Sequence, residues 1–187
     1  MSDEVEIRRE LRAGDLGEIV AHHGRVYRRE YGVDSTFEAH VAGSVGEVAR
    51  RGFPREREGI WIVEAGGRHA GSIALSDEGD GIAALRWFVL DPELRGRGLG
   101  RRLVGEVLAE ADAHGYDLLK LETFSELKVA AHLYREHGFE LVSAETGPRW
   151  GRPEITYQRY ERGFQRRAHD LSSASAGSSS RPFSVKA

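Results

Sequence analysis

The stretch LRWFVLDPELRGRGLGRRLVGEVL, residues 85–108, holds the pattern that decides the fold. It begins with aromatic and branched apolar side chains, which are typical of a buried strand. Asp91-Pro92 ends that strand, because proline has no N–H for the ladder and restricts the residue before it. From Leu99 onward, apolar residues recur at helical spacing. The stretch therefore predicts a strand over 82–90, a glycine-rich loop and a helix.

Glycines mark the start of this helix. Gly98 and Gly100 stand there, although glycine costs roughly 1 kcal/mol against alanine inside a helix. Glycine at such a position indicates that another group approaches the backbone closely or that the dihedral angles are unusual. Together with Gly96, they leave peptide N–H groups unscreened beside the positive end of the helix dipole, where a phosphate can bind. A solvated glycine turn is the alternative interpretation.

The same loop is rich in arginine, with Arg95, Arg97, Arg101 and Arg102. Cations are unfavourable beside the positive end of a helix, and they become favourable once a polyanion reverses the local field. Two common nucleotide motifs do not fit. No lysine follows the glycines as a Walker loop requires, and the spacing is GxGxG rather than GxGxxG. The loop therefore predicts a phosphate site of another kind.

Composition narrows the class of protein. A chain of 187 residues, 40% apolar and 30% charged, is typical of one ordinary globular domain. The net charge of -3 is evidence against a nucleic-acid partner. The absence of cysteine excludes disulfides, thiolate zinc sites and a cysteine nucleophile. The sequence has no apolar run long enough for a signal peptide or a membrane span. We therefore expect a soluble, cytoplasmic protein without a membrane partner.

The eight histidines do not form a metal-binding pattern. His22 and His23 are adjacent, and His132 and His137 are five residues apart. Neither pair has the HxxxH spacing that places two ligands on one helix face. We therefore expect no metal site.

Periodicity and turn residues place the remaining elements. Strands are expected over 5–9, 60–65, 70–75, 82–90, 118–123, 139–143 and 155–160, and helices over 16–27, 37–48, 99–111 and 126–137. The last two strands are expected to be joined by a loop that contains Gly147, Pro148 and Gly151. This order predicts a mixed α/β sheet with helices on its faces. Residues 1–162 form one domain, and the serine-rich segment 163–187 is expected to be disordered.

Two motifs resemble those of a known family. Residues 95–100, RGRGLG, resemble the (Q/R)xxGxG/A motif of the GNAT superfamily of N-acetyltransferases, with the family's preceding strand and DP turn. Residues 130–142, AAHLYREHGFELV, resemble its LYxxxGF segment. The resemblance covers about 5–160 and implies an α/β (α+β) GNAT fold. That fold is a mixed, mostly antiparallel twisted sheet of about seven strands, splayed between strands 4 and 5 and flanked by about four helices.

Within the superfamily, a finer resemblance exists. The run over 85–100, the pattern at 121–127 and the late segment RWGRPEITYQRY resemble the acetyltransferase half of bacterial MarR–GNAT fusion proteins. No winged-helix half precedes these motifs in this sequence, so the DNA-directed role of those fusions is not carried over.

The resemblance implies a site for acetyl-CoA as co-substrate. Backbone groups of the fourth strand would pair with the pantetheine arm as an added strand does. Side chains of Leu85, Trp87 and Val89 would meanwhile share one face of that strand and pack in the core. Amides of the glycine loop would hold the pyrophosphate. The expected cofactor-binding residues are Phe88, Val89, Leu90, Arg95, Gly96, Arg97, Gly98, Leu99, Gly100, Arg101, Ala131 and Tyr134.

Tyr134 resembles the family tyrosine that protonates the departing thiolate, the alternative being a core aromatic side chain. The proton acceptor for the amine is less marked. The fourth strand carries no acid, and Leu127 replaces an asparagine frequent in the family. Glu122 and Glu30 are the candidates. For each, a solvated surface carboxylate is the alternative, and a water chain could also take the proton.

The resemblance thus implies an enzyme that transfers the acetyl group to a primary amine by direct attack. A longer acyl-CoA substrate, or a sensor that binds acetyl-CoA without turnover, is the alternative. The acceptor would be chosen by residues 15–51 and the loop near 149–152. An aminoglycoside, a polyamine, a small amino compound and a peptide N-terminus are all compatible. Dimers are common in the family, so a homodimer stays open beside a monomer.

Overall fold

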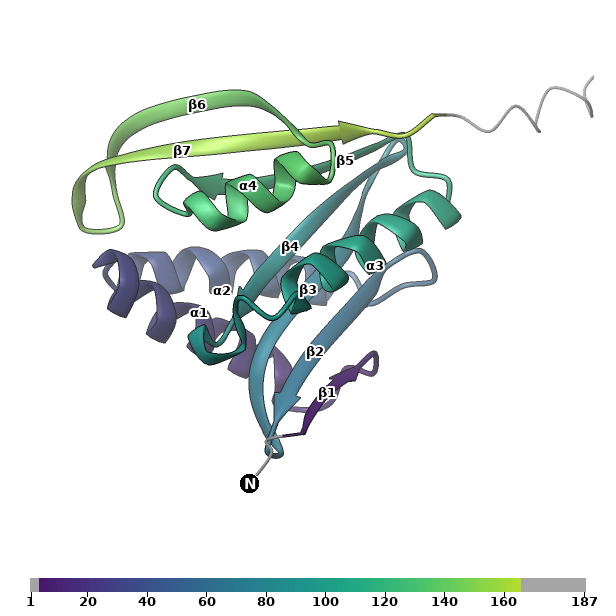
Figure 1. Cartoon of the computed structure of the whole chain (residues 1–187), viewed down its shortest axis with the longest axis horizontal. Coiled ribbons are helices and arrows are strands. Elements are labelled where there is room, and N and C mark those ends of the chain that lie inside the picture. Colours follow the sequence, from purple (N-terminus) through teal and green to yellow (C-terminus); the bar gives the residue numbers. More distant parts are fainter. Residues whose placement is uncertain (1–3, 166–187) are drawn as a thin grey trace, which may run out of the picture.

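Seven strands form one mixed sheet in the computed structural model, which describes residues 4–165 (Figure 1). The strands are β1 (Val5–Arg8), β2 (Gly59–Ala65), β3 (Arg68–Gly79), β4 (Ile82–Leu90), β5 (Leu118–Phe124), β6 (Glu140–Arg149) and β7 (Arg152–Gly163). Their order is β1-β2-β3-β4-β5-β7-β6. The α-helices within these residues are α1 (Asp15–Tyr31), α2 (Ser35–Arg50), α3 (Leu99–Ala113) and α4 (Lys128–Glu136), and the 3₁₀ turn η1 (Pro92–Leu94) precedes α3. The mixed α/β fold expected from the sequence is confirmed.

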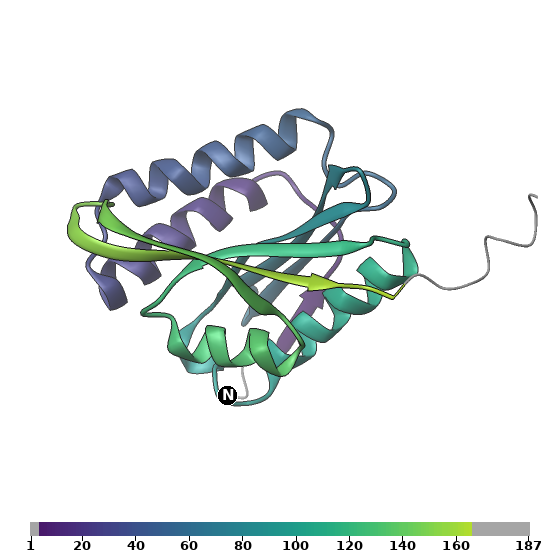
Figure 2. The same ribbon diagram turned by 90° about the horizontal axis from the view of Figure 1, so that it is seen from above.

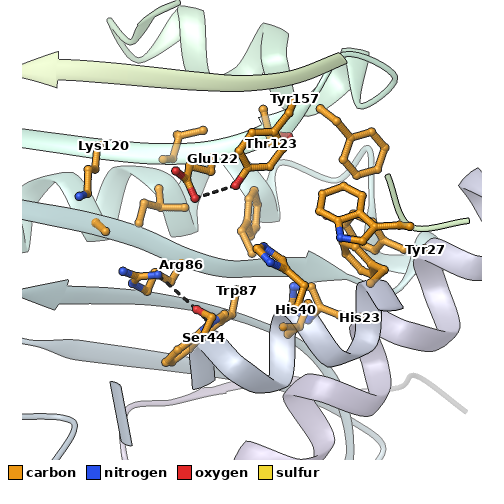
Figure 3. A pocket seen from close by; sticks show the side chains of 18 of the residues that line it. His23, Tyr27, His40, Ser44, Arg86, Trp87, Lys120, Glu122, Thr123 and Tyr157 are labelled. Atoms are coloured by element: carbon orange, nitrogen blue, oxygen red, sulfur yellow. Dashed lines mark hydrogen bonds between the residues drawn. The ribbon is translucent and has the colours of Figure 1, made fainter. Parts of the chain in front are cut away.

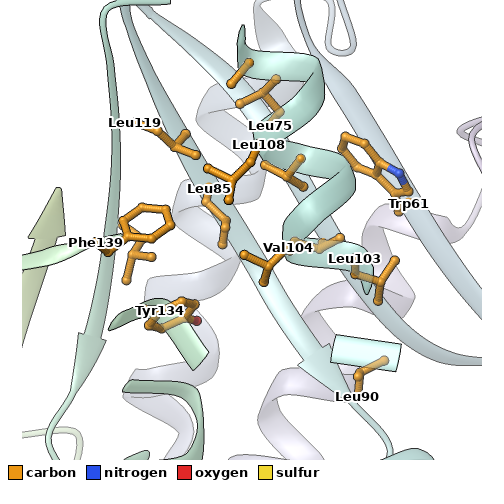
Figure 4. Close-up of a cluster of buried hydrophobic side chains, with 14 of the residues drawn as sticks. Trp61, Leu75, Leu85, Leu90, Leu103, Val104, Leu108, Leu119, Tyr134 and Phe139 are labelled. Atoms are coloured by element: carbon orange, nitrogen blue, oxygen red, sulfur yellow. The ribbon is translucent and has the colours of Figure 1, made fainter. Parts of the chain in front are cut away.

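Helices cover both faces of the sheet. Figure 2 shows α1 and α2 on one side and α3 and α4 on the other. The α3 side holds the larger cluster of buried side chains, which includes Leu103 and Val104 of α3 (Figure 4). The α2 side holds a second cluster, which includes Phe37, Val41 and Val45. Because both faces are covered, the central strands are buried along most of their length.

Strands β4 and β5 pair only where they begin. Their parallel pairing joins residues 82–84 to residues 118–120, and beyond it the two strands diverge (Figure 1). Strand β4 follows β3 along its length, and β5 follows β7 from Leu118 to Phe124. The expected splay between the fourth and fifth strands is therefore present. It leaves the later part of β4 with a free edge toward β5.

A β-bulge reverses the faces of β4. Ser72 pairs with Val89 and Ala74 pairs with Arg86, so two residues of β4 lie opposite one residue of β3. Trp87 in this bulge has a φ of 49°, in the left-handed region. The expectation that Leu85 and Trp87 share one face is wrong. Leu85 packs in the α3 cluster and Trp87 in the α2 cluster, because the extra residue shifts the alternation.

The C-terminal hairpin is longer than the sequence predicts. Strands β6 and β7 continue to Arg149 and from Arg152, so the expected loop shrinks to Trp150 and Gly151. These two residues have φ values of 53° and 75°, the positive pair that a tight hairpin turn requires. Pro148 is tolerated within β6 because β6 is an edge strand with an irregular register at this point.

The domain boundary expected at residue 162 falls one residue short of the end of β7 at Gly163. The serine-rich segment expected over 163–187 lies, from residue 166 onward, outside the described residues.

Candidate active site

A cavity of about 200 Å³ opens where β4 and β5 part (Figure 3). Both strands line it, and side chains from α1, α2, α4 and the β6-β7 hairpin complete the walls. Tyr27 comes from α1 and Tyr134 from α4, on opposite faces of the sheet. The cavity therefore extends through the gap between the strands.

The glycine loop forms the start of α3 as expected. Gly98 is the N-cap, with a φ of 80°, and Gly96 has a φ of 74°. No side chain caps this helix, and its first backbone hydrogen bond runs from the N–H of Arg102 to the carbonyl of Gly98. The amides before Arg102 thus have no partner within the helix. A Cβ at Gly96 or Gly98 would meet no heavy atom within 4 Å, so the loop faces open space.

The arginines of the loop have acidic partners of their own. Arg95 donates to Glu30 at 2.8 Å, Arg101 to Glu136 at 2.7 Å and Arg102 to Glu106 at 2.8 Å. These three arginine side chains are 38%, 63% and 65% exposed, so water screens the pairs and each contributes little to stability. Their position at the helix start is thus explained in part without an anion. Pairs this weak can rearrange around a phosphate.

Tyr134 lies at the α4 side of the cavity. Its side chain is 5% exposed and packs against Phe139 and Tyr160. Burial raises the pKa of Tyr134, so the phenol stays protonated at neutral pH. Ala131, nearly one turn earlier on α4, is equally buried in the α3 cluster. Gly100 of α3 lies against Phe88, which brings the start of α3 to β4.

The two candidate carboxylates occupy different places. Glu122 of β5 lines the cavity and accepts a hydrogen bond of 2.7 Å from the hydroxyl of Tyr157 (Figure 3). Glu30, at the end of α1, binds Arg95 and is not among the residues that line the cavity. The structure thus brings Glu122 and Tyr134 to one cavity and places Glu30 at the glycine loop.

Sequence reasoning missed the polar residues of the α2 wall. His40 and Ser44 both line the cavity, together with Phe37 and Val41. Burial lowers the pKa of His40, which keeps its ring neutral at pH 7. Ser44 accepts hydrogen bonds from Arg86 at 3.2 Å and from the indole of Trp87 at 3.1 Å. The sequence contained a pattern that could have placed these two residues together, because residues 37, 40, 41 and 44 share one helix face.

Arg86 and Lys120 were also missed as cavity residues. Lys120 is two residues before Glu122 on β5, and side chains two apart in a strand share a face. That alternation could have paired them from the sequence. Arg86 could not be placed, because the bulge turns it and Trp87 toward the same helix.

Residues 4–165 contain neither of two further features. No group of three or more His, Asp or Glu side chains among them is arranged to hold a metal ion. No helix in this part of the chain is both long enough and apolar enough to cross a membrane.

Parted strands with a glycine-capped helix beside the gap are the arrangement that the sequence resemblance implies. The profile described as the acetyltransferase (GNAT) family matches residues 25–139, and the chain belongs to that family. An uncharacterized N-acetyltransferase of Schizosaccharomyces pombe is 30% identical over 140 residues, which cover 72% of this chain and 82% of that protein.

Solved structures share the fold. A GNAT-family acetyltransferase from Streptococcus pneumoniae superposes with a TM-score of 0.64 at 21% identity, over 87% of this chain and all of the other. The structure of yncA from Salmonella typhimurium, solved with its cofactor acetyl-CoA, gives a TM-score of 0.66 at 17% identity, over 88% of this chain and 96% of the other. The finer resemblance to MarR–GNAT fusion proteins stays a prediction.

Proposed function

We propose that this protein transfers the acetyl group of acetyl-CoA to a primary amine by direct attack in a ternary complex. One observation carries the proposal: β4 and β5 stop pairing after residue 84 of β4, and the cavity between them is lined from both faces of the sheet. A gap of this kind admits two substrates from opposite sides. Family membership and the acetyl-CoA complex of the Salmonella structure support the choice of donor.

The residues present fit a bound acetyl-CoA. Beyond Ala84, the edge of β4 that faces β5 does not pair with β5, and the segment from Phe88 to Leu90 can add an extended pantetheine arm as a further strand in place of the hydrogen bond of 3.0 Å that the Nε of Arg95 donates to the carbonyl of Leu90. The loop from Arg95 to Arg101 presents uncapped helix amides to open space, where a pyrophosphate can lie. When bound, acetyl-CoA supplies the thioester carbon that the amine attacks, and the N–C bond forms as the C–S bond breaks.

Three groups of the chain then polarise the carbonyl and transfer the protons. A backbone N–H on the edge of β4 that faces β5 polarises the carbonyl, because Val89 pairs with Ser72 and its N–H faces β3, as does that of Asp91, which donates to Ala70. Glu122 takes the proton that the attacking amine loses, and the phenol of Tyr134 protonates the leaving thiolate. Exchange with water restores both groups. Because the carboxylate of Glu30 is already bound to Arg95 outside the cavity lining, the geometry favours Glu122 over Glu30 as the base.

Isothermal titration with acetyl-CoA, desulfo-CoA and NAD tests the donor site. We expect saturable binding of both CoA compounds and none of NAD, followed by release of free thiol in an amine screen. Absence of heat with either CoA compound, from protein shown to be folded, would overturn the proposal.

We place the reaction in the cytoplasm, since a chain without cysteine fits a reducing compartment.

A further inference from the structure

The charged side chains that line the cavity are unevenly distributed, and their distribution bears on the identity of the acceptor. Lys120 and Glu122 lie on the cavity face of β5, and Arg86 reaches the same cavity from β4 (Figure 3). Lys120 is the residue that pairs with Ala84 at the last point of contact between the strands, and Arg86 lies just beyond that point. Two cations therefore stand at the closed end of the gap, with Glu122 farther toward its open end.

These cations share one carboxylate. Glu78 accepts from Arg86 at 2.7 Å, lies 3.5 Å from Lys120 and lies 3.8 Å from Arg51. Among the side chains that line the cavity, the cations Arg86 and Lys120 outnumber the carboxylate of Glu122, and Glu78, which pairs with both cations, is not one of the lining residues. Lys120 and Arg86 are 34% and 22% exposed, so their surplus is directed in part into the cavity. A pocket with this surplus favours a ligand that carries an anionic group.

The wall beyond Glu122 is aromatic. Phe37 stacks on Tyr27 with ring centroids 4.7 Å apart and meets Trp150 edge-on at 5.0 Å. Tyr157 packs against Trp150 at 5.9 Å, and Arg149 lies 4.4 Å over the Tyr157 ring. The aromatic side chains offer apolar surface to the body of a small ligand.

We infer that the acceptor is a free amino acid with a large apolar side chain. Lys120 and Arg86 bind its carboxylate, Glu122 receives its amine, and the wall of Tyr27, Phe37 and Trp150 covers its side chain. This inference rests on the proposed function. It disfavours polyamines and aminoglycosides, because each added ammonium group would meet the surplus of positive charge.

Matched acceptors test the inference with acetyl-CoA as donor. Free-thiol release gives kcat/KM for L-phenylalanine, phenylalaninamide and phenethylamine, for L-leucine and isopentylamine, and for spermidine. We expect each amino acid to exceed its amide or decarboxylated partner roughly ten- to a hundredfold, the range for a hydrogen bond to a charged group. Lys120→Met should remove most of that preference, measured as the ratio of kcat/KM for L-phenylalanine to kcat/KM for phenethylamine.

Lys128→Met is the matched control, because Lys128 is exposed at the start of α4 and does not line the cavity. It should keep the full preference. Equal use of amino acid and decarboxylated amine, or a preference for spermidine, would overturn the inference, whereas acetyl-CoA binding without turnover of any acceptor would overturn the proposed function and favour the sensor alternative. Failure to bind acetyl-CoA would also remove the proposed function, so failure of the inference and failure of the proposed function are distinguishable.

Discussion

Tyr134 shows how surroundings prepare one residue for a task. It is buried among Phe139, Tyr160 and the α3 cluster, yet it also lines the cavity. Burial favours the neutral phenol, and a neutral phenol is the form that can donate a proton. The core interpretation and the catalytic interpretation of this residue are therefore compatible.

Tyr134→Phe should lower kcat about a hundredfold or more, because general acid catalysis contributes roughly 10² to 10⁴ in rate. Binding of acetyl-CoA should stay within about twofold, since the ring and its packing remain. Thiol release and isothermal titration measure the two effects. A variant with unchanged turnover would show that another donor protonates the thiolate, and a wild type without turnover would favour the sensor alternative.

Gly98 is the second residue at which an added side chain should change the function, here the binding of acetyl-CoA. Its φ of 80° disfavours any side chain, and the space before it is the proposed path of the pyrophosphate. Gly98→Glu should abolish detectable binding of acetyl-CoA, because it adds strain, bulk and a negative charge there. Gly105→Glu, on the same helix, should bind normally, because a Cβ at Gly105 would meet no heavy atom within 4 Å and its φ is not positive. Equal affinity in both variants would refute the assignment of the loop.

At the scale of the element, the bulge in β4 is stabilised by hydrogen bonds to β3 and to α2. Ser72 of β3 donates a hydrogen bond of 2.7 Å to the carbonyl of Trp87, and the indole of Trp87 donates to Ser44 of α2. These contacts offset the strain of a tryptophan in the left-handed region. The bulge in turn shapes the edge of β4 at Phe88 and Val89, where the pantetheine arm is proposed to pair.

Ser72→Ala should therefore affect both stability and binding. Ser72 is fully buried, so loss of its hydroxyl should cost about 1–3 kcal/mol in the free energy of unfolding. Affinity for acetyl-CoA should fall as well, because the bulge loses one support. Urea denaturation and titration check the two effects. Ser143→Ala, on the edge strand β6, serves as control, and matching results for both variants would contradict the role of Ser72.

At the scale of the whole molecule, a histidine cluster joins α1 to the sheet. His22 and His23 of α1 are 3% and 5% exposed, and the rings of His22 and His69 of β3 meet at 5.2 Å. Asp91 lies 3.0 Å from His22. Burial lowers the pKa of His22, and it lowers the pKa of His23 and of His69 to about 4. The folded state thus prefers these rings neutral.

Stability should consequently depend on pH. An unfolded histidine has a pKa of about 6.5, so the unfolded chain binds more protons between about pH 6.5 and 4. Stability is then fully present above pH 6.5 and falls as the pH drops toward 4. His69→Leu should flatten this slope, whereas His132→Leu, whose side chain is 71% exposed, should keep it. Denaturation midpoints across this range measure the effect, and an unchanged slope in His69→Leu would contradict it.

Local patterns in the sequence were enough to predict the order of the elements and the glycine-capped helix, and the phosphate site at that helix start stays a prediction. Each of these depends on neighbours along the chain: apolar spacing, proline and glycine. The helix start at Leu99 and the end of β4 at Leu90 agree with that expectation. The family motifs added the splay between β4 and β5, which the pairing of these strands confirms.

Long-range packing settled the rest. The face of Trp87 depends on a bulge formed against β3, and the charge of the cavity depends on Glu78 reaching Arg86 and Lys120 from another strand. The cavity gathers side chains from six elements and a turn, and no spacing along one element encodes such a meeting. Sequence neighbours determine backbone conformation and burial within an element, whereas convergence of side chains requires every element to be packed in place.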